Sequence, residues 1–239
     1  MALKSINLLD KQFNISYEIV NPSASEDIVF LHGWGSNKDI MKQAFASTLE
    51  NYRHIYIDMP GFGKSTNDYA LTTSDYANII QEFFYNLNAN VVAVAGHSFG
   101  GKVAALLNPK NLILLSTAGI LEEKPFDVKM KIKMAKTLNS FGLGKVTKAF
   151  RSKDVDKMSE NMYATFKNVV DEDFSKSFEN YEKNAMIFWG EDDSATTLPS
   201  GKKINSLIKN SSFESYKGDH YFFIRNAQDI ALRIENGIK

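Results

Sequence analysis

The sequence predicts a mostly parallel, doubly wound α/β fold with a helical segment inserted after the sixth strand. Short apolar runs recur along the chain, and helix-like segments lie between them. Such runs are typical of strands that are buried on both faces of a parallel sheet. The alternation of strand and helix favours βαβ units. A stretch of about 65 residues without a strand-like run indicates the insertion.

Length and composition fit one large domain. The chain has 239 residues, of which 44% are apolar, and this can supply a sizeable core. The 28 basic and 28 acidic side chains balance, which gives no support for nucleic-acid binding. Cysteine is absent, so disulfides, thiolate catalysis and cysteine-ligated metals are excluded.

The start of the chain does not have the pattern of a targeting segment. Residues 1–10 lack a charged start followed by a long apolar run, which a secretory signal would need. No apolar run in the chain approaches the roughly 18 to 20 residues of a membrane span. We therefore expect a cytoplasmic protein without a membrane span.

The first 20 residues predict two short strands. Residues 12–20 alternate in part between apolar and polar side chains, as a half-buried strand does. The later strands are predicted by continuous apolar runs, and a final strand candidate follows them. These segments are residues 28–31, 55–57, 91–95, 112–115 and 185–189, with 212–216 as the last candidate.

The clearest helix is predicted over residues 74–88, where the apolar side chains fall on one face. Thr73 or Ser74 is expected to cap its start. Shorter helices are predicted over residues 38–49 and 100–107.

The segment without strands divides the predicted domain. We assign residues 1–118 and 184–239 to the core and residues 119–183 to a helical cap that lies over the sheet. The alternative is that this segment is an ordinary helical part of the core layer.

Residues 96–100 have the pattern Gly-x-Ser-x-Gly and make Ser98 a candidate nucleophile. In such a turn the serine lies between a strand and a helix, and the small residues on either side let the two approach closely. The predicted strand 91–95 and helix 100–107 supply this context. The alternative is a glycine-rich turn that contains an incidental serine.

A base and an acid follow at the ends of later strands. His220 comes just after the last predicted strand, so it can reach a nucleophile at the end of a neighbouring strand; otherwise it is a surface residue. Glu191, Asp192 and Asp193 directly follow the strand at 185–189. One of these carboxylates is expected to orient His220, and the others are expected to be solvated.

Five motifs together resemble the α/β-hydrolase superfamily, over nearly the whole chain and least in the cap. They are residues 31–35, 58–65, 96–101, 189–193 and 218–220. The resemblance implies the α/β-hydrolase fold and the chain order serine, acid, histidine. It also implies that Asp193, the third residue after the glycine that ends the strand, is the acid. Asp192 stays the alternative.

The resemblance further implies an oxyanion hole made of two backbone N–H groups. The donors would be Trp34, in the loop after strand 28–31, and Phe99, the residue after the nucleophile. Trp34 could also fill space in the core, and both roles are compatible because the donor is backbone.

The function that these residues predict is hydrolysis of a small or medium acyl ester through an acyl-enzyme, without a metal or an organic cofactor. A serine nucleophile argues against the epoxide hydrolase and haloalkane dehalogenase branches. The alternatives are a C–C bond hydrolase of a meta-cleavage dienoate, a thioesterase, or an esterase of carrier-protein acyl methyl esters. Residues 32–37 are similar to the oxyanion loop of esterases of this last kind. A binding protein with the same pocket is a further alternative.

The predicted cap suggests a partner and a pocket. Residues 124–153 hold nine basic side chains and one acidic side chain, which would attract an acidic acyl carrier protein; otherwise they form a solvated helix face. Flexible and aromatic side chains of the cap, together with Trp34, could line an acyl pocket above Ser98; otherwise they pack between cap and sheet. The cap residues are Phe126, Met130, Met134, Phe141 and Met162.

Overall fold

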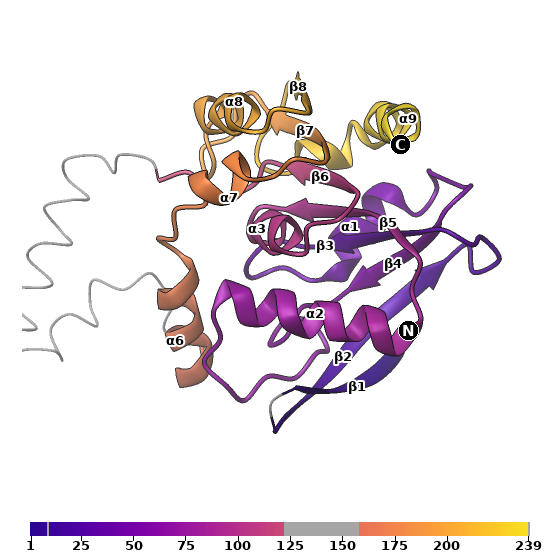
Figure 1. Cartoon of the computed structure of the whole chain (residues 1–239), viewed down its shortest axis with the longest axis vertical. Coiled ribbons are helices and arrows are strands. Elements are labelled where there is room, and N and C mark those ends of the chain that lie inside the picture. The colour runs from indigo at the N-terminus through magenta and orange to yellow at the C-terminus, as the bar shows by residue number, and fades with distance from the viewer. Residues whose placement is uncertain (9, 122–157, 239) are drawn as a thin grey trace, which may run out of the picture.

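The computed structural model describes residues 1–8, 10–121 and 158–238. Its centre is an eight-stranded sheet (Figure 1). The strand order is β1-β2-β4-β3-β5-β6-β7-β8. β2 pairs in antiparallel orientation with β1 and β4, and the other neighbours are parallel. The strands are β1 Ala2–Leu8, β2 Lys11–Val20, β3 Asp27–Leu31, β4 Arg53–Ile57, β5 Val91–His97, β6 Asn111–Leu115, β7 Asn184–Gly190 and β8 Ser211–Tyr216.

Helices cover both faces of this sheet. α2 (Thr73–Leu87), α3 (Phe99–Leu106) and α8 (Leu198–Leu207) pack their apolar side chains into one core cluster. On the other face, α1 (Lys38–Phe45), the short 3₁₀ helix η3 (Phe222–Ile224) and α9 (Ala227–Gly237) form a second cluster. Every residue of β3 and β6 is therefore buried. The predicted mostly parallel sheet with helices on both faces is confirmed.

The local predictions differ from the structure mainly at helix ends. The cap of α2 is Thr72, one residue before the two that we expected. Thr72 and Asp75 form a reciprocal capping box, in which each side chain accepts a backbone N–H of the other residue. α1 ends at Phe45 rather than at residue 49. α8 and α9 were not predicted.

The segment between β6 and β7 holds two helices among its described residues, α6 (Glu160–Val169) and α7 (Ser175–Glu179). α6 packs beside the loop that leads into α2. Asn161 Nδ2 donates to Asn67 O at 2.7 Å, and Leu71 N donates to Thr165 Oγ1 at 2.9 Å. Residues 122–157 lie outside the described residues, so the helical cap over 119–183 stays a prediction.

Because β3 to β8 are parallel, the segments that follow their carboxyl ends meet at one edge of the sheet. Ser98, loop 32–35, residues 191–196 and His220 all come from these segments. Among the helices that the structure describes, none is long and apolar enough to cross a bilayer.

Candidate active site

Ser98 forms a sharp turn between β5 and α3. Its φ of 51° and ψ of −116° fall outside the regions that L-residues normally adopt, at a cost of about 1–3 kcal/mol. The turn is fixed by its own backbone: Ser98 N donates to Leu115 O at 3.1 Å, and Ser98 O accepts from Gly101 N and Ala118 N, each at 3.1 Å. The half-buried Ser98 side chain is thereby held at the carboxyl end of the sheet.

Two glycines allow the chain to pack tightly around this turn. A Cβ on Gly100 would lie 2.5 Å from Leu31 O, so only glycine lets α3 approach the end of β3. A Cβ on Gly33 would lie 3.1 Å from the Cβ of Ser98. The loop 32–35 therefore packs directly against the Ser98 turn, as the oxyanion prediction requires.

Trp34 and Phe99, the two predicted oxyanion donors, line the same cavity as Ser98. Phe99 is the first residue of α3, and the first N–H groups of a helix have no partner within the helix. The Trp34 ring contacts the rings of Phe62, Phe99 and Phe166, with centroids 4.9, 5.6 and 5.4 Å apart. Its buried indole Nε1 has no hydrogen-bond partner among the described residues. The oxyanion role of the two backbone groups stays a prediction.

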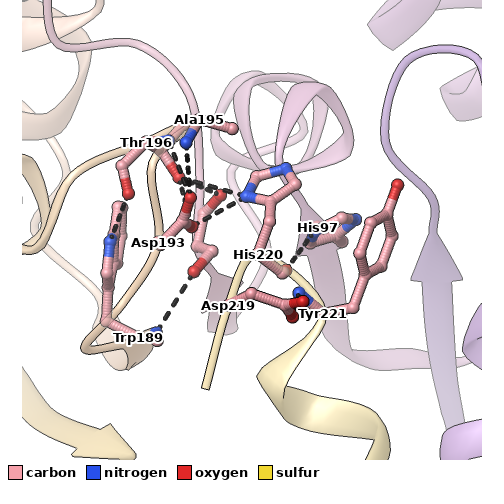
Figure 2. A network of polar contacts seen from close by, with 10 residues as sticks. His97, Trp189, Asp193, Ala195, Thr196, Asp219, His220 and Tyr221 are labelled. Atoms are coloured by element: carbon pink, nitrogen blue, oxygen red, sulfur yellow. Dashed lines mark hydrogen bonds and ion pairs between the residues drawn. The ribbon is translucent and has the colours of Figure 1, made fainter. Parts of the chain in front are cut away.

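His220 lies against Asp193, and the two side chains form a close polar pair (Figure 2). His220 Nδ1 is 2.7 Å from Asp193 Oδ2. The Asp193 side chain is 0% exposed, and that of His220 is 17% exposed. Asp192 is exposed, and its backbone N–H donates to Gly218 O at 3.0 Å. Of the neighbouring carboxylates, Asp193 is the one that touches the histidine.

The environment of Asp193 keeps it ionised. Burial by itself would raise the pKa of this carboxyl. Hydrogen bonds from His220, the Thr196 backbone and the Ser116 side chain outweigh burial, and together with the charge of His220 they lower the pKa to about 2. The carboxylate is therefore charged at neutral pH and can stabilise a protonated His220.

His97 connects the serine turn to the histidine loop. Its Nε2 lies 3.0 Å from the backbone oxygen of His220, and the two rings have centroids 4.5 Å apart. Burial lowers the pKa of His97 to about 3, so the ring is neutral and Nε2 can donate. This contact places the backbone of His220 against His97, the residue that precedes Ser98.

His32 fixes the other side of the site. Its Nε2 accepts the Met59 N–H at 3.0 Å, and its Nδ1 lies 2.8 Å from Gly33 O. Burial lowers the pKa of His32 to about 4, so the ring is neutral, with its proton on Nδ1. His32 thus links loop 32–35 to the loop that follows β4.

A cavity of about 220 Å³ opens at Ser98. Its lining includes Trp34, Phe99, Lys102, Phe166 and Thr196. Met162, a predicted pocket residue, is buried and packs near Gly61 and Asn67. The other predicted cap residues of the pocket lie outside the described residues, and they are Phe126, Met130, Met134 and Phe141.

Three residues near the site were not predicted from the sequence. Ser116 and Thr196 contact Asp193, and Lys102 lines the cavity four residues after Ser98. No local motif identifies them, because each acquires its role only through contacts with distant segments. Within the described residues, no group of three or more histidine, cysteine, aspartate or glutamate side chains is arranged to hold a metal ion.

Comparison with known proteins gives a family match over most of the chain. Residues 28–200 match the family model described as "Alpha/beta hydrolase family". The structure also resembles that of an esterase from Exiguobacterium antarcticum, with a TM-score of 0.75 and 22% identity over 98% of both chains. At this identity the likeness shows the fold alone.

Curated relatives match shorter segments. A pimeloyl-[acyl-carrier protein] methyl ester esterase of Pseudoalteromonas atlantica is 39% identical over 99 residues, which are 38% of this chain and 37% of the relative. The corresponding enzyme of Pectobacterium carotovorum is 36% identical over 58 residues, which are 24% of this chain and 23% of the relative. The matches thus span about a quarter to just over a third of these relatives.

Proposed function

Because the chain belongs to the alpha/beta hydrolase family, we propose that it is a serine esterase. Its triad is Ser98, His220 and Asp193, and its oxyanion donors are the backbone N–H groups of Trp34 and Phe99. One observation carries the proposal: Asp193 is in contact with His220 at 2.7 Å, and the backbone oxygen of His220 lies 3.0 Å from the ring of His97, the residue before the strained Ser98. The substrate is an ester with a small or medium acyl group.

The reaction proceeds in two steps. His220 Nε2 takes the proton from Ser98 Oγ as this oxygen attacks the ester carbonyl carbon. Asp193 stabilises the imidazolium, and the Trp34 and Phe99 N–H groups bind the oxyanion. The intermediate expels the alcohol, which receives the proton from His220. Water, deprotonated by His220, then attacks the acyl-enzyme, releases the carboxylic acid and regenerates Ser98.

The first test is hydrolysis of p-nitrophenyl esters from acetate to octanoate by wild type and Ser98→Ala. We expect the wild type to hydrolyse these esters and Ser98→Ala to be inactive. The dependence of the rate on acyl chain length then measures the size of the pocket. Ser47→Ala is a matched control, because Ser47 is exposed and lies on the loop before β4, away from the site. Hydrolysis that persists in Ser98→Ala would contradict the mechanism.

A second candidate function is hydrolysis of a carrier-protein acyl methyl ester, and the names of the curated relatives favour it. The acidic carrier would dock on the basic residues 124–153, which lie outside the described residues. Replacing Lys129, Lys133 and Lys136 with glutamate should slow the carrier-linked ester and leave p-nitrophenyl esters unaffected. Equal turnover of the carrier-linked ester would reject the docking site.

The remaining alternatives are tested with the same protein. An acyl thioester and a meta-cleavage dienoate distinguish a thioesterase and a C–C bond hydrolase from an esterase. A stable covalent product without turnover would favour the binding protein. The cytoplasmic location stays a prediction from the sequence, and cell fractionation tests it.

A further inference from the structure

The two oxygens of the Asp193 carboxylate are held by different groups. Oδ1 accepts the backbone N–H groups of Ala195 at 2.8 Å and Thr196 at 2.9 Å. Oδ2 faces His220 Nδ1 at 2.7 Å and the Thr196 hydroxyl at 2.9 Å (Figure 2). The Thr196 side chain therefore contacts the same carboxylate oxygen that accepts the hydrogen bond from His220 Nδ1.

The direction of the Thr196 hydrogen bond follows from the chemistry of its neighbours. Thr196 Oγ1 lies 2.9 Å from Asp193 Oδ2, 3.0 Å from Ser116 O and 3.4 Å from His220 Nδ1. A hydroxyl has one proton, and an ionised carboxylate is a stronger acceptor than a backbone carbonyl. His220 Nδ1 already donates to Asp193, so it offers no acceptor. The Thr196 hydroxyl therefore donates its hydrogen bond to Asp193 Oδ2.

Thr196 is itself fixed from two sides. The indole Nε1 of the fully buried Trp189 donates to Thr196 O at 2.9 Å. The Thr196 side chain also packs against Ser116, which follows β6, and Gly190 N donates to Ser116 Oγ at 3.3 Å. Contacts of this kind hold the hydroxyl in one place before any substrate arrives.

We propose that the Thr196 hydroxyl is a positioning group that orients Asp193 Oδ2 toward His220 and takes up part of the carboxylate charge. In this way it sets the pH at which His220 becomes a base. Its contribution to catalysis rests on the proposed esterase function, whereas its effect on the His220 titration does not. Thr196 acts through Asp193.

The titratable groups in contact with His220 determine in which direction its titration midpoint should move when the Thr196 hydroxyl is removed. They are Asp193 from the loop after β7, His97 from the end of β5, and Tyr221, which follows His220 on the segment after β8. Burial lowers the pKa of His97 to about 3, so this ring stays neutral over the relevant pH range. Removing the Thr196 hydroxyl leaves more negative charge on Asp193 Oδ2, which favours protonated His220.

The test is Thr196→Val, which removes the hydroxyl and keeps the branched shape and the backbone N–H. NMR of the His220 ring in the resting protein should give a titration midpoint about half a pH unit or more above that of the wild type. If p-nitrophenyl butyrate is a substrate, the acid limb of kcat/KM should shift in the same direction. We expect kcat to fall by about 10-fold or more, with a small change in KM.

Thr117→Val is the matched control. Thr117 is buried and follows Ser116, and its hydroxyl has no hydrogen-bond partner among the described residues. The same chemical change there should leave the His220 titration and kcat as in the wild type. Thr196→Ser, which keeps the hydroxyl, should restore the wild-type midpoint.

Three results would overturn the proposal: an unmoved or lowered midpoint in Thr196→Val, an equal shift in Thr117→Val, or no rescue by Thr196→Ser. If Thr196→Val fails to fold, Thr196→Ala carries the same expectation, since it also lacks the hydroxyl and keeps the N–H. If the wild type hydrolyses no ester, the proposed function fails, and the NMR titration still decides the role of Thr196.

Discussion

At the scale of single residues, the choice between Asp192 and Asp193 rests on one contact. The two carboxylates are adjacent in the sequence, yet only the Asp193 side chain is buried, and it meets His220 at 2.7 Å. Two chemically similar neighbours in the turn after β7, which ends at Gly190, therefore have different environments.

Asp193→Asn should reduce kcat for the tested ester by about a thousandfold or more. An amide cannot stabilise the imidazolium, and its NH₂ group favours the wrong histidine tautomer. Steady-state kinetics at pH 8 measure the effect. Asp192→Asn is the matched control and should retain wild-type kcat, because that side chain is exposed. The reverse result would assign the acid to Asp192.

The Asp193 carboxylate also affects stability at acid pH. The folded-state pKa of about 2 lies below the ordinary value, so the unfolded chain binds this proton first as the pH falls. The stabilisation is complete above about pH 4 and is lost as the pH falls toward 2. Urea unfolding at pH 4.5 and 3 should show a smaller decrease for Asp193→Asn than for wild type. Equal decreases would contradict this prediction.

At the scale of elements, α3 connects the serine turn to α6. Lys102 on α3 is only 2% exposed, and its Nζ donates to Val169 O, at the carboxyl end of α6, and to Glu172 Oε2 at 3.0 Å. Burial lowers the pKa of Lys102, and the Glu172 carboxylate opposes this shift. The ammonium thus caps α6, whose Phe166 lines the cavity at Ser98.

Lys102→Met should reduce the free energy of unfolding by about 2 kcal/mol, because the partly buried Glu172 carboxylate loses its cationic partner and keeps the Thr73 hydroxyl. Lys102→Met combined with Glu172→Gln should recover part of this loss, since the unpaired charge is then gone. Urea unfolding of the two single variants and the double variant measures the coupling. Strict additivity of the two losses would show that the pair does not interact energetically.

At the scale of the whole molecule, we expect buried histidines to cause most of the change in stability with pH in mildly acid solution, because the charges of the chain balance. The chain has 28 basic and 28 acidic side chains, so general charge repulsion is small at neutral pH. Burial lowers the pKa of His32 to about 4 and that of His97 to about 3. Between these values and the ordinary value of 6.5, each ring takes up a proton when the protein unfolds, and this favours the unfolded chain.

The free energy of unfolding should therefore decrease as the pH falls from 7 to 5. Both folded-state pKa values lie below the ordinary value of 6.5, so the stabilisation is complete above pH 6.5 and declines below it. Each histidine contributes a slope of up to about 1.4 kcal/mol per pH unit. Urea denaturation at pH 8.5, 7, 6 and 5 measures the curve, which should be flat above pH 7. A flat curve down to pH 5 would contradict the prediction.

The sequence by itself determined the central strands of the sheet and the turn at Ser98. Continuous apolar runs placed the strands from β3 to β7, because a strand covered on both faces must be apolar along its whole length. The pattern around Ser98 is equally local, since the glycines are required by close approaches within and beside the turn. The predicted start of α2 was wrong by one or two residues, because the position of the cap at Thr72 depends on a pair of reciprocal hydrogen bonds with Asp75.

Only the tertiary structure decided how the Asp193 carboxylate is held. Ser116, Thr196 and Asp193 lie on two segments about 80 residues apart in the chain, and they meet because β6 and β7 are neighbours in the sheet. No pattern in either segment encodes that contact. Lys102 likewise has no motif that identifies its partners, and its ammonium group meets the carboxyl end of α6 only through the packing of α6 against α3. Local patterns specify elements and turns, whereas the pairing of distant side chains depends on how the elements pack.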